Sequence, residues 1–194
     1  MLLQEVAARF CNTPVYYYSG GQWLESCVRG RIPPYDRFIS DRAFGQKKRL
    51  LQTPGGQLLP ASDYYRVGGP DRRTYMVESL NEDLDEYGAY LNVYMIREVQ
   101  DVCAILVQDR STTRPSGVAK SSFVVQDTVW VDLDRFGVLR SDELEVDYTS
   151  YTITLPKGVV VPDDCRLRID GKLYAVTEDF TQMQLRQLRV RGIG

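Results

Sequence analysis

The sequence predicts an all-β protein made of two tandem, related small β-barrels or sandwiches, with few short helices. Three observations predict this class. Short segments of alternating apolar and polar residues recur along the 194-residue chain, glycines and prolines fall mostly between them, and a pattern in the first half returns in the second. A period of two is the pattern of a strand that buries one face, and frequent turns are typical of barrels and sandwiches.

The expected strands are rich in β-branched and aromatic residues, which favour strands. Val15–Tyr18 precedes two glycines, and Tyr90–Ile96 places Leu91, Val93 and Met95 on one face. The other expected strands are Val102–Val107, Phe123–Leu133 (which carries Val125, Val129 and Val131), Tyr151–Leu155, Val159–Val161 and Leu185–Val190. The segments Leu2–Phe10 and Ser141–Leu144 are the candidates for short helices, and the polar segment Ser111–Gly117 is expected to be a loop.

The clearest local signal is a hairpin that turns at Asp170-Gly171. This dipeptide suits a type I′ turn, because glycine tolerates the positive φ that the turn requires. The flanking alternation predicts a buried hairpin core formed by Leu167, Ile169, Tyr174 and Val176.

An internal repeat supports two domains, expected at residues 1–97 and 98–194. Pro54, Gly56 and Pro60 match residues Pro156, Gly158 and Pro162, which lie 102 positions later. After the insertion Gly68-Gly69-Pro70 the spacing becomes 99, and it then pairs Asp71, Tyr75 and Val77 with Asp170, Tyr174 and Val176. Repetition at turns and alternating strand positions is what a shared fold produces.

The composition disfavours several classes of function. The chain has no histidine, which removes the commonest general base and neutral metal ligand. The net charge of −2 is unlike that of a strongly basic nucleic-acid binder, and no apolar run approaches the ~20 residues of a membrane span. We therefore expect no catalytic set, no metal site and no cofactor.

Two acidic patterns leave an alternative open. The stretch Glu78–Glu86 is expected to be a solvated acidic loop, with a calcium site as the alternative because hard oxygen ligands are dense there. Asp132 and Asp134 are expected on the outer face of a strand, with a carboxylate pair for acid–base chemistry as the alternative.

The cysteines Cys11, Cys27, Cys103 and Cys165 match no zinc spacing. They are expected to be reduced, mostly buried thiols of a chain folded in a cytoplasm, with a Cys27–Cys165 disulfide as the alternative.

Two groups of side chains are candidates for binding. Lys47, Lys48 and Arg49 form the one compact basic cluster, and Arg110 and Arg114 flank the polar loop. These basic loops are candidates for contact with DNA or with an acidic partner, while solvated loop tips are the alternative. Tyr16–Tyr18, with Trp23 or Trp130, offer a stacking surface for sugars or single-stranded nucleic acid, although packing is the commoner use of such residues.

The C-terminal segment resembles the small head-closure, or stopper, proteins among the head–tail connectors of tailed phages. The resemblance covers residues 148–191 and rests on Val161-Pro-Asp163, Ile169-Asp-Gly171, Lys172-Leu-Tyr174-Ala-Val176 and the final strand Leu185–Val190. It implies a non-enzymatic virion protein, assembled in the host cytoplasm, that forms a hexameric or dodecameric ring and lines or closes the DNA channel. Its implied partners are portal or adaptor proteins, tail proteins and packaged DNA, with no membrane. The greater length and apparent doubling leave open whether it acts as stopper, adaptor, terminator or tail hub.

Overall fold

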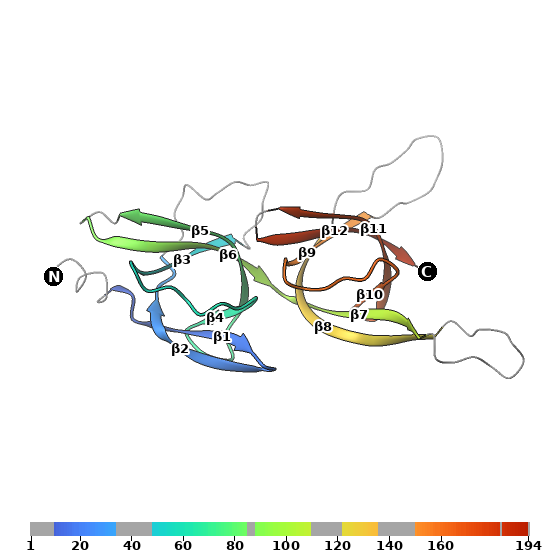
Figure 1. Ribbon diagram of the computed structural model, residues 1–194, viewed down its shortest axis with the longest axis horizontal. Helices are drawn as coiled ribbons and strands as arrows, with labels where there is room; N and C mark the ends of the chain where they lie inside the picture. The colour runs from blue at the N-terminus through green and yellow to red at the C-terminus, as the bar shows by residue number, and fades with distance from the viewer. Residues whose placement is uncertain are drawn as a thin grey trace, which may run out of the picture. The chain divides into compact units, whose positions relative to one another are not determined.

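The structure is a computed structural model that describes residues 10–33, 48–84, 88–109, 122–135, 150–182 and 184–193 (Figure 1). All twelve elements of these residues are strands, which confirms the all-β class. The expected loop Ser111–Gly117, the expected helix Ser141–Leu144 and all of Leu2–Phe10 except Phe10 lie outside the described residues.

The chain divides into two compact units, Met1–Val99 and Gln100–Gly194, with the division two residues after the expected position 97. The first unit is a sheet with the strand order β2-β1-β4-β5-β6-β3. Its strands are β1 (Thr13–Ser19), β2 (Gln22–Gly30), β3 (Lys48–Pro54), β4 (Tyr65–Val67), β5 (Thr74–Leu84) and β6 (Tyr90–Val99).

The second unit is a closed six-stranded barrel. Read from β8, its order is β8-β7-β10-β11-β12-β9, and β9 pairs with β8 again. Its strands are β7 (Asp101–Asp109), β8 (Ser122–Arg135), β9 (Ser150–Pro156), β10 (Arg166–Ile169), β11 (Lys172–Gln182) and β12 (Leu185–Ile193).

The two units share one topology, strand for strand. In each, the fourth strand lies beside the first, as in a Greek key. The register agrees as well: Leu51 pairs with Tyr94 as Ile153 pairs with Leu188. The bulges also coincide, because the register shifts between Val77 and Ser79 in β5 and between Val176 and Glu178 in β11. The repeat in the sequence therefore corresponds to a repeated fold.

The units differ at the seam that closes the barrel. In the second unit, Asp132–Arg135 of β8 pair with four residues of β9. In the first unit, the pairing among the described residues is a single bridge between Arg31 and Gln52. Pro33 follows two positions after Arg31, and proline has no N–H to donate to a ladder. Within the described residues, the seam is therefore shorter in the first unit than in the second.

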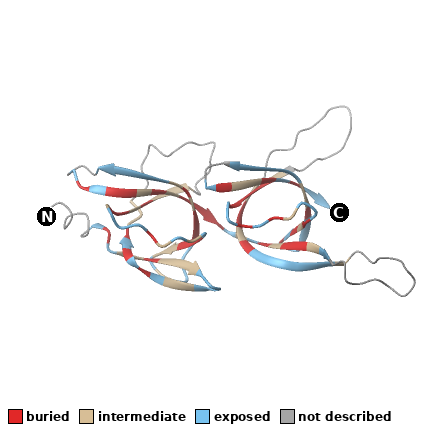
Figure 2. Cartoon of the chain, viewed as in Figure 1, coloured by how far each residue is buried: buried red, intermediate tan, exposed pale blue. Residues whose placement is uncertain are grey.

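Each unit has its own apolar core, formed by inward-facing residues of its strands (Figure 2). Leu51, Ile96 and Val15 are fully buried in the first core, and Ile153 and Leu188 in the second. Burying such a side chain contributes about 1.5–3 kcal/mol.

The hairpin at Asp170-Gly171 has the expected form. Ile169 pairs with Lys172, so the loop has two residues, and their φ angles are +48° and +77°. Leu167, Ile169 and Tyr174 are buried, and Val176 is half-buried against the same core. The sequence prediction of this hairpin and its core is confirmed.

The loop that follows β3 or β9 is held in both units by the matching position of the last strand. In β6, Asn92 Nδ2 donates to the carbonyl oxygens of Pro54 and Gln57, at 3.1 and 3.0 Å. In β12, Arg186 donates to the carbonyl oxygens of Val159 and Val161, at 3.0 and 3.4 Å.

The expected strand Val159–Val161 is wrong. These residues lie in the loop between β9 and β10. Gly158 and Pro162 flank them, and the side chain of Arg186 takes two of their carbonyl oxygens in place of a neighbouring strand. The apolar run is part of a loop. Its residues Val159 and Val161 are buried against the second core, while Val160 is exposed.

Candidate partner-binding surfaces

The end of the β7–β8 ribbon exposes a run of apolar side chains. Phe123, Val124 and Val125 are 39, 45 and 50% exposed. Pairing with β9 begins only at Asp132, so among the described residues no strand covers the outer edge of β8 from Phe123 to Thr128. An edge strand with apolar residues on both faces is a ready template for another chain.

A bulge explains why Val125 faces outward. Ile105 pairs with Asp127 but Leu106 pairs with Val125, so Gln126 is an extra residue in β8. Because side chains alternate, one inserted residue reverses the faces that follow it. Val129 stays in the core while Val125 moves to the surface, contrary to a simple alternation over Phe123–Leu133.

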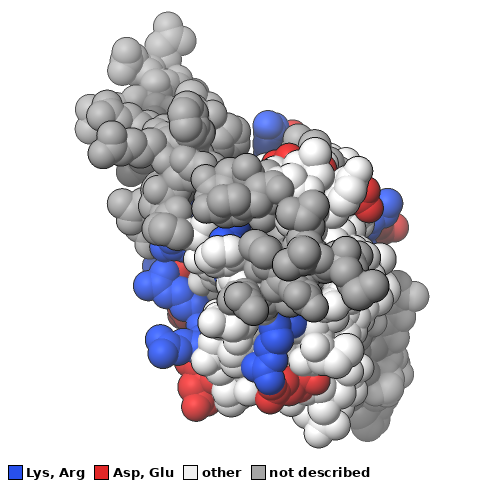
Figure 3. All heavy atoms as spheres, turned by 90° about the vertical axis from the view of Figure 1, so that its left-hand side faces the viewer, with Lys and Arg blue, Asp and Glu red and all other residues white. Residues whose placement is uncertain are grey.

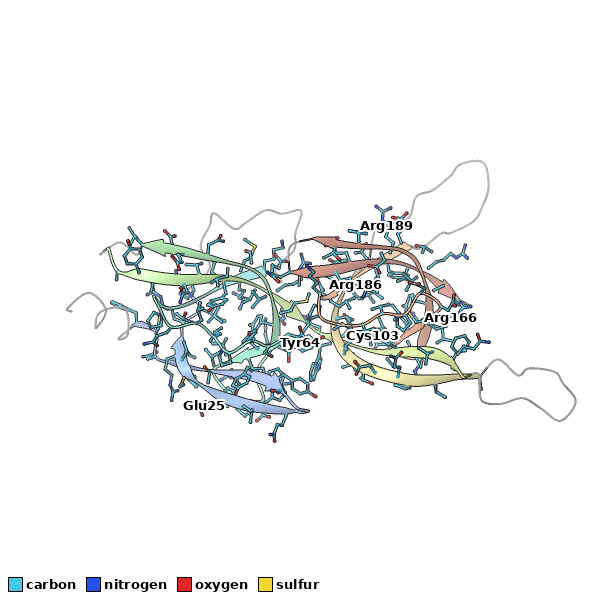
Figure 4. All side chains as sticks on the ribbon, in the orientation of Figure 1. Glu25, Tyr64, Cys103, Arg166, Arg186 and Arg189 are labelled. Atoms are coloured by element: carbon cyan, nitrogen blue, oxygen red, sulfur yellow. The ribbon has the colours of Figure 1, made fainter. Side chains whose placement is uncertain are left out.

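The outer face of the second barrel combines arginines with apolar side chains, and we call it the basic face. One row across neighbouring strands holds Val125, Leu106, Arg166, Ala175 and Arg191, and the next holds Arg168, Leu173 and Ile193. The Arg166 guanidinium lies 5.7 Å from the Phe123 ring centroid. Arg168 and Arg191 are exposed, and neither forms an ion pair with a carboxylate among the described residues. Figure 4 shows Arg166 on the outside of this barrel.

The end of the β5–β6 hairpin carries the opposite charge, and we call it the acidic hairpin end. It comprises Leu80, Glu82, Asp83, Leu84 and Tyr90, all exposed. Leu84 pairs with Tyr90, and Leu80 and Glu82 lie on the same face by alternation. Part of the stretch expected to be an acidic loop is thus a strand.

In the first unit, the expected stacking surface is packed on itself. The Tyr18 and Trp23 rings lie 5.2 Å apart, Tyr64 lies edge-on to Tyr18, and the Arg66 guanidinium is 4.1 Å from the Trp23 ring centroid. Arg66 also donates to Thr74 Oγ1 at 3.1 Å. One face of Trp23 is therefore covered by a guanidinium that is itself held in place, and a base or sugar would have to displace it.

Only Lys48 and Arg49 of the expected basic loops lie within the described residues. Lys48 and Arg49 are in strand β3 and not in a loop, while Lys47, Arg110 and Arg114 lie outside the described residues. Lys48 Nζ lies 2.9 Å from Glu78 Oε2, so an acidic side chain of the same unit compensates its charge. On the face that Figure 3 shows, basic and acidic side chains likewise lie next to one another.

Glu78 belongs to a buried ion cluster. Its other oxygen accepts a 2.5 Å hydrogen bond from Arg97 Nε, and both side chains are more than 90% buried. Glu78 is therefore engaged by two cations and is unavailable to calcium. Among the residues that the structure describes, no group of three acidic, cysteine or histidine side chains could hold a metal ion.

Asp132 lies on the outer face of β8, as expected, because its neighbours Val131 and Leu133 face the core, but it is fully buried there. It pairs with Thr154 at the seam between β8 and β9, where both residues are covered.

All four cysteines are free, and three are buried. The alternative of a Cys27–Cys165 disulfide is not formed, since Cys27 is exposed and Cys165 is buried in the second core. Cys103 lies within the second barrel (Figure 4), and burial raises the pKa of its thiol to about 12. Such a thiol is inert at neutral pH.

No protein-family model matches the sequence, and no curated protein matches it. None of the described residues forms a helix long and apolar enough to cross a membrane.

Proposed function

We propose that this chain is a non-catalytic assembly protein that forms part of a ring joining the head of a tailed phage to its tail. The observation that carries the proposal is the edge of β8, where Phe123, Val124 and Val125 are exposed and no described strand pairs. Isolated two-sided apolar edges aggregate, so such an edge is kept where a partner covers it. The C-terminal resemblance to head-closure proteins supplies the class of particle.

In this function the two units act as rigid bodies and their exposed edges and outer faces act as contacts. Portal or adaptor proteins, tail proteins and other copies of the chain are the partners, packaged DNA occupies the channel, and the site of action is the virion. The alternative, a module that binds carbohydrate or single-stranded nucleic acid, is less favoured because Arg66 covers the face of Trp23 that a ligand would use.

The test combines a mass measurement by light scattering with negative-stain imaging, on the purified protein alone and mixed with virion components. We expect ring-shaped particles or a stable complex with a neighbouring virion protein. Cryo-microscopy of the source particle is the second measurement. The proposal is wrong if this chain is not found along the portal–tail axis. Titration with oligonucleotides and glycans tests the alternative.

A further inference from the structure

The geometry points to head-to-tail self-association, in which the acidic hairpin end of one copy docks on the basic face of the next copy. This inference rests on the proposed function, because it names the surfaces and the partner through which the ring forms.

The acidic hairpin end has an unpaired strand edge and exposed apolar side chains. β4 pairs with β5 only at Thr74 and Tyr75, so beyond them β5 has a described partner only in β6. Leu84 and Tyr90, which are 52 and 68% exposed, face the same side as Leu80 and Glu82. Large apolar side chains gathered on one face around a carboxylate are typical of a contact surface.

The basic face is complementary in both charge and polarity. Arg166 and Arg168 lie two positions apart on β10, and Arg191 lies on β12, which only β11 separates from β10. With strands about 4.8 Å apart, Arg166 and Arg191 are about 10 Å apart across the sheet. Like charges at that spacing repel one another, and a carboxylate placed between them lowers this repulsion. The exposed side chains of Phe123, Val125, Leu173 and Ile193 lie beside these arginines and offer apolar area to the leucines of the hairpin.

A protein partner fits this face better than DNA does. Phosphate groups gain nothing from exposed apolar side chains, whereas Leu80, Leu84 and Tyr90 bury theirs against them. A second copy fits best, because the same chain supplies the matching acidic and apolar surface.

The two surfaces lie on different units of the chain, so the contact is heterologous. Each docking event leaves one acidic hairpin end and one basic face unused. Repeated association then gives a closed ring or an open filament.

The test uses charge reversal in the full chain, followed by sedimentation velocity at low salt. The acidic variant carries Glu82→Lys with Asp83→Lys, and the basic variant carries Arg168→Glu with Arg191→Glu. We expect wild-type protein to self-associate with increasing concentration and each variant alone to associate at least about tenfold more weakly. The control variants reverse exposed charges elsewhere, Asp163→Lys with Asp164→Lys and Arg72→Glu with Lys157→Glu, and should associate as wild type does.

Mixing the acidic variant with the basic variant is the more discriminating experiment. In a head-to-tail contact, one interface of the mixture pairs lysines with glutamates and the next pairs the two wild-type surfaces. An equimolar mixture should therefore associate as strongly as the wild-type protein. In an isologous contact, where each copy uses the same surface, mixing would not restore association in this way.

Three outcomes overturn the inference: wild-type protein that stays monomeric up to its solubility limit, a mixture that fails to recover, and controls that weaken association equally. A further overturning result comes from a duplex DNA titration, if the basic variant loses DNA binding while its self-association is unchanged. If wild-type rings form but the mixture does not recover, this interface is wrong while the proposed function stands. If the chain is absent from the particle's axis, the proposed function fails whatever these variants do.

Discussion

Replacing Asn92 tests whether a single amide holds the loop after β3. The side chain is 1% exposed, and its Nδ2 donates to the carbonyl oxygens of Pro54 and Gln57. Asn92→Ala removes these two hydrogen bonds and a longer one, of 3.4 Å, to Thr53 Oγ1. Asn92→Asp keeps the shape of the side chain, but it places a carboxylate oxygen, which only accepts hydrogen bonds, against the carbonyl oxygens of Pro54 and Gln57.

The size of the loss follows from these contacts. Each of the two shorter bonds contributes about 0.5–1.5 kcal/mol, so Asn92→Ala should lower the free energy of unfolding by about 1–3 kcal/mol. The loss stays in this range because each carbonyl keeps a donor: Gln57 N–H bonds to Pro54 O, and Thr53 Oγ1 donates to Gln57 O.

Asn92→Asp should cost more at neutral pH, on the order of 3–5 kcal/mol, because it leaves an uncompensated buried charge. Burial should raise the pKa of this carboxyl in the folded state. Its cost then grows as pH rises above about 4, where the unfolded chain ionises first, and shrinks below that pH.

The chain provides one tryptophan in each unit, Trp23 and Trp130. In a Trp130→Phe background, urea unfolding followed by fluorescence reports on the first unit alone. Asn81→Ala, at an exposed position of β5, is the matched control and should leave the midpoint unchanged. The reasoning is refuted if Asn92→Ala unfolds at the same midpoint as the parent, or if the control loses as much.

Three further predictions concern stability. Leu188→Ala, at a fully buried position, should cost about 2–5 kcal/mol in urea unfolding followed at Trp130, and a cost under 1 kcal/mol would contradict the core assignment. Arg97→Ala should cost about 3 kcal/mol, since it leaves Glu78 buried with one cation, and Glu78→Gln in the same chain should recover part of the loss. The Arg186 hydrogen bond lowers the pKa of Asp179, so this pair stabilises the fold above the ordinary value of 3.8 and loses its effect as pH falls through the lower folded value. Asp179→Asn should flatten the pH dependence of the melting temperature between pH 5 and pH 2, taken as about the range over which a carboxylate titrates, and an unchanged slope would contradict it.

Local signals predicted the turns and the repeat well. The Asp170-Gly171 hairpin follows from residues adjacent in sequence, and the matched prolines at 54 and 156 end equivalent strands β3 and β9. Such features depend on backbone preferences of a few residues, which a single sequence displays directly.

The faces of the strands were harder to predict, because bulges depend on pairing with a distant strand. Leu91, Val93 and Met95 were expected to share a face, yet Tyr94 and Ile96 on the opposite face form the core of the first unit. Apolar residues on both faces of β6 leave alternation ambiguous.

The candidate binding surfaces were largely missed for the same reason. The bulge at Gln126 brings Val125 to the surface, and no residue pattern within β8 predicts this bulge. The basic face gathers Arg166 and Arg168 from β10 and Arg191 from β12. Arg191 follows Arg168 by 23 positions in the sequence, so only the sheet order reveals the cluster. The run Phe123-Val124-Val125, apolar on consecutive residues of one expected strand, was the one available hint.

Asn92 and Arg186 occupy the same place in two copies of one fold and perform the same task with different chemistry. The first holds its loop with a neutral amide that is sealed from solvent, and the second with a cation that also binds the Asp179 carboxylate near the surface. Dissolved ions weaken contacts between partly exposed charges and hardly affect buried neutral hydrogen bonds. Ionic strength should therefore weaken the contact that holds this loop in the second unit and hardly affect the corresponding contact in the first, although both units have the same architecture.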